Sequence, residues 1–449
     1  MRIFSLITKK NVMVSIFAKF GKVGLVWYNI VAFVLGAVAG VIIKVSLAEN
    51  KEIFDTVVGF IAPFGTILVS MLKAVVIPII FFSLIGGSSS LPLKKFGKLG
   101  AKVIGFYILT SLMATIFGVI MAYVFSPSIS NPEGEALPLL AQVDVVKTSI
   151  SEGDNMLVKM LLGAFMNPFQ ALSESRFLAI IVFAIIFGLA ARSIIESSSE
   201  SDSAPISKML QVFDGINKTI FKVVGWMMFY FPIGIFSLSF VNFAVYGLEL
   251  FGSYAEIAGC VIVGIVLMIV VVYPAIIFFT CRENPYKILA KLREPIITAF
   301  ATRSSAATLP VSLDTAENKL KVKSEISGFA LSLGATINMD GVCLHLPVFV
   351  ILAAGIFGLD ITTSQIFLVV ISVVFASIGT GGVPGGSIFL LFMVLDVLHL
   401  TPAQTSTIVA LALGINPLLD MFETACNVAG DNVGNYVVAK TSSMLKDDV

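Results

Sequence analysis

Carboxylates and amides lie inside apolar stretches of this sequence, where they are costly to bury. The last apolar stretch, about 403–440, carries five polar side chains at relative positions 0, 3, 4, 7 and 11: Asp420, Glu423, Thr424, Asn427 and Asp431. This spacing places all of them on one face of an α-helix. Charged groups within a membrane span face the protein interior and indicate binding sites, so we expect this face to point inward.

A second polar group lies within the stretch 325–355, in the sequence Gly-Ala-Thr-Ile-Asn-Met-Asp-Gly that begins at Gly334. It offers oxygen ligands and a glycine that permits a locally unwound backbone, at Thr336, Asn338, Asp340 and Gly341. Oxygen ligands without nitrogen or sulfur suit a hard cation. Three hydroxyls in the stretch 101–126, at offsets 0, 3 and 4, either join such a site or bond a neighbouring helix: Tyr107, Thr110 and Ser111.

The composition predicts an all-α polytopic membrane protein. Of 449 residues, 57% are hydrophobic and only 13% are charged, about half the charge of an ordinary soluble chain. The 29 basic and 28 acidic residues nearly cancel, so no charge excess points to nucleic acid. Four scattered cysteines and two histidines lack metal-ligand spacing, and no nucleophile–base pair is evident. We therefore expect neither an enzyme nor a zinc site. We expect His345 to be a packed helix residue, and His399 to lie at a helix end.

Six apolar stretches precede residue 285, and basic clusters separate them unevenly. The stretches lie near 24–46, 55–89, 101–126, 177–196, 207–245 and 256–280. Lysines around residues 9–22 and 94–102, and the basic cluster around 282–293, fall on one side under the positive-inside rule. The acidic loop 127–158 falls on the other side. We expect a multi-pass protein of the plasma membrane with both termini in the cytoplasm, the first stretch being an anchor rather than a signal peptide.

Two later segments, 288–320 and 362–398, are each interrupted by small and polar residues. The interruptions cover 302–308 and 377–386, and they leave arms too short to span a bilayer alone. Irregular backbone at membrane depth survives only where it is buried in protein or lines a watery cavity. We interpret the segments as two re-entrant hairpins, the paired interruptions that mark a transporter's central site. The alternative is two loosely packed spans with helix-packing glycines.

Four of these motifs, in this order, resemble the glutamate transporter homologues of the dicarboxylate/amino acid:cation symporter family. They are Arg303-Ser304-Ser305, Asn338-Met339-Asp340-Gly341, the sequence from Gly379 to Gly385, and the polar face of the last helix. The resemblance implies eight transmembrane helices, two hairpins and a homotrimer in the lipid bilayer. It also implies an elevator in which a transport domain (101–126 and 251–449) slides against a scaffold domain (1–100 and 127–250).

The resemblance further implies that Na⁺ is the coupling ion. One sodium site would use the backbone of Gly334 and Asn338 with side chains of the last helix, Asn427 and Asp431. A second would use Thr336 with the tip of the second hairpin: Ser377, Ile378 and Thr380. A third would use Asn338 and Asp340 with the hydroxyl cluster: Tyr107, Thr110 and Ser111. Every side chain of the third site is present in this sequence.

The substrate contacts implied by the resemblance include one charge reversal. They are Arg303, Ser304, Ser305, Val342, Val383, Asp420, Glu423, Thr424 and Asn427. Asp420 stands where the family binds the substrate ammonium. Glu423 stands where carriers of acidic amino acids have the arginine that binds the side-chain carboxylate, and a buried glutamate would repel that group. Asn416, where those carriers have an aspartate, and Val342, where they have a threonine, are further departures.

We therefore expect a Na⁺-coupled symporter of a neutral or basic α-amino acid. If Arg303 reaches Glu423, the two charges cancel and a neutral side chain suits the pocket. If Arg303 points away, Glu423 would pair with a cationic side chain. The alternatives are a symporter of acidic amino acids or dicarboxylates coupled to Na⁺ or H⁺, and a passive ion channel, which would need a continuous polar pore.

Overall fold

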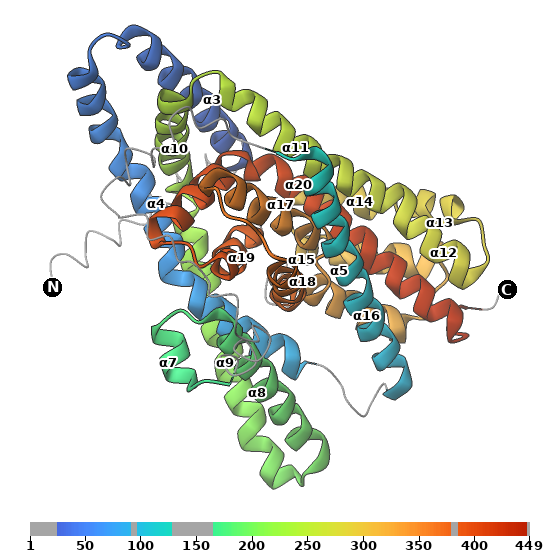
Figure 1. Ribbon diagram of the computed structural model, residues 1–449. Coiled ribbons are helices and arrows are strands. Elements are labelled where there is room, and N and C mark those ends of the chain that lie inside the picture. Colours follow the sequence, from blue (N-terminus) through green and yellow to red (C-terminus); the bar gives the residue numbers. More distant parts are fainter. Residues whose placement is uncertain (1–24, 91–96, 128–164, 379–384, 447–449) are drawn as a thin grey trace, which may run out of the picture. The chain divides into compact units, whose positions relative to one another are not determined.

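The computed structural model describes residues 25–90, 97–127, 165–378 and 385–446, and these are almost entirely helical (Figure 1). The chain divides into two compact units, which are taken separately below. The first comprises Met1–Met71 with Lys222–Leu250, and the second Leu72–Phe221 with Phe251–Val449. The prediction of an all-α polytopic membrane protein is confirmed. Residues 1–24, with the lysines near the N-terminus, and most of the acidic loop 127–158 lie outside the described residues.

In the first unit, α3 (Leu25–Ser46) packs along α10 (Phe231–Tyr246) at very short range. A Cβ atom on Gly36 or Gly40 would lie 2.4 or 2.3 Å from a backbone oxygen of α10, so only glycine permits this approach. Small residues at such positions are typical of helices that associate within a membrane. Ser237 joins α10 to the first part of α4 (Lys51–Ser89): its hydroxyl donates to the Ile61 carbonyl oxygen over 2.7 Å.

Seven helices of the described segments are long and apolar enough to cross a membrane, and an eighth span results if α9 and α10 are counted together. The sequence analysis treated 207–245 as one stretch, whereas α9 (Glu200–Met227) ends before α10 begins. Pro232, at the start of α10, explains the break, because a proline ring has no N–H to continue the helical ladder. A long span is also formed by α11 (Glu249–Leu267), a π-helical turn (Met268–Val272) and α12 (Tyr273–Cys281).

The second unit contains the helices that carry the predicted site. They are α5 (Gly97–Phe125), α14 (Arg293–Thr302), α15 (Ser305–Asp314), α16 (Ser324–Ile337), α17 (Asp340–Phe357), α18 (Thr363–Ser377), α19 (Gly386–Leu395) and α20 (Pro402–Thr441). Helix α20 packs against α14, α16, α17 and α19, as Figure 1 shows. The rest of the described chain comprises α8 (Phe177–Ser197), which is one of the seven membrane-length helices, and shorter elements. These are α7 (Pro168–Ser173), α13 (Pro285–Lys291) and two single turns, Thr315–Lys319 and Asp396–Leu398.

Both predicted interruptions separate short helices. The arms α14, α15 and α19 have 10 residues each and α18 has 15, whereas a transmembrane helix needs about 20. At the first interruption Arg303 adopts a left-handed conformation, with φ of 56°, and the Ser304 side chain caps α15. Residues 379–384 of the second interruption, with the predicted contacts Thr380 and Val383, lie outside the described residues. The division into scaffold and transport domains stays a prediction.

Candidate substrate and ion site

The polar face of α20 points inward as predicted. A capping box fixes the start of the helix: the Thr401 side chain accepts from the Gln404 backbone, and the Gln404 side chain accepts in return. Pro402 is the first residue of the helix, and its ring holds the φ angle near the helical value. All five polar residues of the face are no more than 5% exposed: Asp420, Glu423, Thr424, Asn427 and Asp431.

An unwound segment between α16 and α17 positions the second group of oxygens. Asn338 and Met339 have φ and ψ of −105° and 91°, and of −118° and 59°, so the helix is interrupted for two residues. The Asn338 amide and the Asp340 carboxylate are fully buried there. The interruption is held against α20, because the Gly341 amide donates to the Asn427 side-chain oxygen over 2.7 Å.

Side chains from α5, the unwound segment and α20 meet in one oxygen cluster. The Thr110 hydroxyl donates to Asn338 Oδ1 and the Ser111 hydroxyl donates to Asp340 Oδ1, each over 3.2 Å. The Asn338 amide donates to Asp431 Oδ1 over 3.0 Å. The structure thus brings together the residues predicted for the third sodium site and, at Asp431, for the first. Tyr107 directs its hydroxyl to the Ala330 carbonyl oxygen at 2.8 Å.

The sequence analysis did not single out Tyr273, which contributes to this cluster from the first residue of α12. Its hydroxyl donates to Asp340 Oδ2 over 2.7 Å. Tyr273 follows the π-helical turn, which shifts the register of the helix at that point. An aromatic residue in a long apolar run carries no local sign of such a contact, so only the packing of α12 on α20 identifies it.

The donor set of the cluster fits a hard monovalent cation. Neither Asp340 nor Asp431 forms a salt bridge within the described segments, although both carboxylates are buried. Hydroxyl and amide groups alone do not compensate two buried charges, whereas one monovalent cation at each carboxylate would. Two glycines keep the space open: a Cβ atom on Gly334 would lie 2.5 Å from Asp431 Oδ1, and one on Gly430 would lie 2.7 Å from Asp340 Oδ2.

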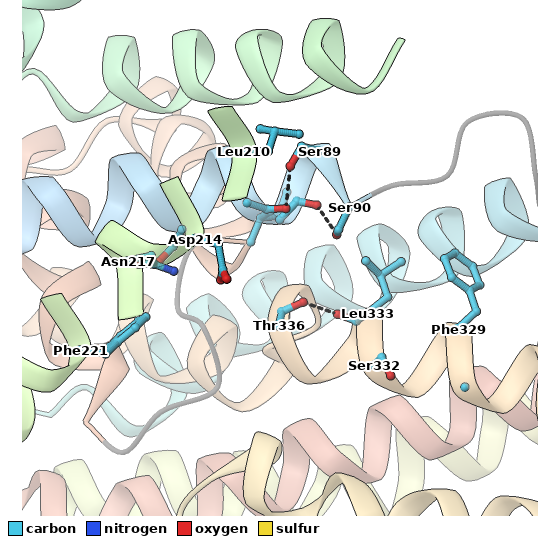
Figure 2. Close-up of a pocket in the computed structure, with 15 residues that line it drawn as sticks. Ser89, Ser90, Leu210, Asp214, Asn217, Phe221, Phe329, Ser332, Leu333 and Thr336 are labelled. Atoms are coloured by element: carbon cyan, nitrogen blue, oxygen red, sulfur yellow. Dashed lines mark hydrogen bonds between the residues drawn. The ribbon is translucent and has the colours of Figure 1, made fainter. Parts of the chain in front are cut away.

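Two of the residues predicted for the second sodium site form hydrogen bonds within their own helices. Thr336 and Ser377 donate back to carbonyl oxygens of their own helices, at 2.8 and 2.7 Å. Thr336 and Ile378 instead line a cavity of about 560 Å³ together with α4 and α9 (Figure 2). Another cavity of about 180 Å³ is lined by residues that include Tyr107, Ser111, Ser377 and Ile378. The predicted ligands of the second and third sites therefore share the wall of a cavity.

Arg303, at the tip of the first hairpin, pairs with Asp420. Its Nε and Nη2 atoms lie 2.6 and 2.5 Å from Asp420 Oδ2, and both side chains are almost completely buried. The Gly385 amide, at the start of α19, donates to the same oxygen over 3.1 Å. Of the two arrangements that the sequence left open, the structure has the one in which Arg303 does not reach Glu423.

Among the other predicted contacts, Ser305 and Val342 are buried, and the Thr424 hydroxyl donates to the Asp420 carbonyl oxygen over 2.7 Å.

Glu423 contacts His345 of α17, a pairing that the sequence analysis missed. Nδ1 of His345 lies 2.6 Å from Glu423 Oε1, and each side chain is 1% exposed. The two groups meet without the alignment of a hydrogen bond. The His345 ring also packs edge-on against Phe349, with 4.8 Å between ring centroids. Gly341, which packs on the Glu423 backbone, is four residues before His345 and so shares its helix face, but the sequence alone does not show that this face meets Glu423.

The helical spans and the buried oxygen cluster are typical of a membrane transporter. The sequence model of the sodium:dicarboxylate symporter family matches residues 25–441, and the chain belongs to this family. A serine/threonine transporter, SstT, of Bifidobacterium adolescentis is 30% identical, over 90% of this chain and 88% of its own length. Human neutral amino acid transporter B(0) is 29% identical, over 92% and 80%. The proton/sodium-glutamate symport protein of Bacillus caldotenax is 28% identical, over 95% and 96%.

Membership confirms the resemblance and the prediction that the chain is not an enzyme. The family consists of symporters, so the chain is a multi-pass carrier of amino acids or dicarboxylates that moves them together with a cation. The passive channel is thereby set aside.

Proposed function

We propose that this chain is a sodium-coupled symporter of a neutral α-amino acid. The observation that carries the proposal is the pairing of charges on the inward face of α20. Arg303 lies against Asp420, and His345 lies against Glu423. Two basic groups thus accompany two carboxylates within a region of the protein that is closed to solvent.

Electrostatics in a buried site favour a substrate that adds no net charge. Each of the two carboxylates lies against a basic side chain, so neither lacks a basic partner. An amino acid with an uncharged side chain brings one ammonium and one carboxylate group and adds no net charge. An acidic side chain would leave one negative charge in excess and a basic one a positive charge, and isolated buried charges are strongly unfavourable.

Sodium coupling is supported by the oxygen cluster. Two bound Na⁺ ions, one at Asp431 in the first predicted site and one at Asp340 in the third, would neutralise the two carboxylates that have no basic partner in the described chain. Asn338 lies between them, with Thr110 and Asp431 as its hydrogen-bond partners. Ser111 and Tyr273 orient Asp340 from the other side. We assign Na⁺ to this cluster first, and to Thr336 and Ser377–Thr380 as a further site on the basis of the family resemblance.

The direct test is uptake by the purified chain in proteoliposomes, with a panel of labelled amino acids. We expect accumulation of neutral amino acids under an inward sodium gradient and none when choline replaces sodium. Uptake driven fully by a pH gradient would contradict the choice of ion. Saturable sodium-dependent uptake of aspartate alone, or of lysine alone, would contradict the choice of substrate while leaving the symporter intact.

Gly430 offers a test of the sodium assignment in which no predicted ligand residue is replaced. A Cβ atom there would lie 2.6 Å from the Tyr273 hydroxyl and 2.7 Å from Asp340 Oδ2. Gly430→Ala should therefore displace the carboxylate and weaken sodium binding by about 1–3 kcal/mol, the usual effect of overpacking. The measurement is the sodium concentration that gives half-maximal uptake. Gly355→Ala is the control, because no atom lies within 4 Å of the added methyl group; equal sodium affinities of the two variants would refute the assignment.

The larger-scale features of the family complete the proposal. They are a homotrimer, an elevator movement of residues 101–126 and 251–449 against residues 1–100 and 127–250, and location in the plasma membrane with both termini in the cytoplasm. Family membership supports all of them. The mass of the detergent-solubilised particle tests the trimer, and labelling of single cysteines from either side of the membrane tests the orientation.

A further inference from the structure

None of the four polar atoms of the His345–Glu423 pair has a hydrogen-bond partner within the described residues, and both side chains are 1% exposed. Nδ1 and Oε1 at least lie against each other at 2.6 Å, whereas no contact is formed by Glu423 Oε2 within the described pair. A buried carboxylate oxygen without a donor is costly, and native structures rarely leave one unsatisfied. The oxygen therefore points to a donor supplied by a ligand.

The position of Glu423 on α20 indicates how far that ligand extends. Glu423 follows Asp420 by three residues on the same helix face, which corresponds to about 4.5 Å along the axis. Asp420 is the acceptor proposed for the substrate ammonium. The ammonium group and the side chain of an amino acid are attached to the same α-carbon. When the ammonium group lies at Asp420, a short side chain covers this distance, so its hydroxyl or amide group would reach the Glu423 carboxylate.

We infer that the preferred substrate has an uncharged side chain carrying a hydrogen-bond donor, and that Glu423 Oε2 accepts from it. This inference rests on the proposed function. His345 is the positioning residue: its contact with Oε1 offsets the negative charge, which would otherwise favour an ammonium or guanidinium group. In carriers of acidic amino acids, the resemblance places an arginine at this position, which favours a substrate side chain that accepts hydrogen bonds. Glu423 and His345 stand there in this chain, so the pocket favours a substrate side chain that donates one.

The wild-type protein gives the first test, by competition binding in saturating sodium. Threonine and valine have nearly the same shape and differ in the hydroxyl, as serine and alanine differ by one hydroxyl. A hydrogen bond to a charged, desolvated acceptor predicts that threonine binds about ten- to a hundredfold more tightly than valine. Serine should exceed alanine by a similar factor.

Two variants separate the roles of the pair. His345→Gln removes the basic ring that lies against Glu423 Oε1, so lysine should compete at least about tenfold better than in the wild type. His399→Gln, at the exposed end of the Asp396–Leu398 turn, is the matched control and should not change the lysine affinity. In the double variant His345→Leu with Glu423→Leu, the threonine-to-valine ratio should fall to about one, because no acceptor remains.

The outcomes distinguish this inference from the proposed function. Sodium-dependent binding of valine and alanine as tight as that of threonine and serine would overturn the donor inference and leave a neutral amino acid symporter. Unchanged lysine affinity in a folded His345→Gln protein would overturn the role of His345. Binding of aspartate or lysine alone by the wild type would instead overturn the proposed function.

Discussion

Replacing Asp340 with asparagine should raise the sodium concentration required for half-maximal uptake by more than about tenfold. The substitution keeps the size of the side chain but removes a fully buried charge that has no basic partner within the described segments. An ion that leaves water needs that charge, and bonds to charged groups contribute about 1.5–3 kcal/mol. Tyr273 and Ser111 donate to Asp340, and the amide oxygen can still accept one of these bonds.

The measurement is initial uptake as a function of sodium at fixed, saturating substrate. Asp360→Asn is the control, since Asp360 is exposed in the loop between α17 and α18. If sodium dependence stays the same in Asp340→Asn while the protein remains folded, Na⁺ does not bind at the cluster.

Asp420→Asn should reduce amino-acid binding by at least about a hundredfold and also lower the stability of the carrier. The substitution removes the acceptor proposed for the substrate ammonium and leaves the Arg303 guanidinium buried without a carboxylate. Breaking one side of a buried ion pair costs about 3–5 kcal/mol. Thermal unfolding in detergent reports the stability, and binding of labelled substrate reports the affinity.

A double variant separates these two effects. Arg303→Gln combined with Asp420→Asn should recover much of the lost stability, because no buried charge is left unpaired, but binding should stay lost. Glu294→Gln removes the exposed pair between Glu294 and Lys319 and should change neither quantity appreciably. Recovery of substrate binding in the double variant would show that Asp420 does not contact the substrate ammonium.

The sequence predicted those parts of the molecule whose signals are local. The face of α20 follows from the spacing of five polar residues in one helix. The break between α16 and α17 follows from polar residues beside Gly341, and the short hairpin arms from small and polar residues in apolar runs. In each case a few neighbouring residues determine the structure.

The sequence could not predict contacts that depend on the register between helices far apart in the chain. Asp420 and Glu423 lie on one helix face, and only the placement of the first hairpin tip decides that Arg303 reaches Asp420. His345 meets Glu423 because α17 packs closely on α20 at Gly341, and Tyr273 reaches Asp340 after a π-helical turn. Composition and periodicity carry no information on how far one helix is shifted along another.

One carboxylate oxygen, Asp420 Oδ2, receives three donor groups: two from the Arg303 guanidinium and one from the Gly385 amide. An oxygen so fully occupied has no vacant position for an incoming ammonium group. An ammonium group that binds at this oxygen must therefore displace one of the three donors. The net affinity is then a difference between two similar bonds, and a carrier that must release its cargo on the far side benefits from such moderate binding.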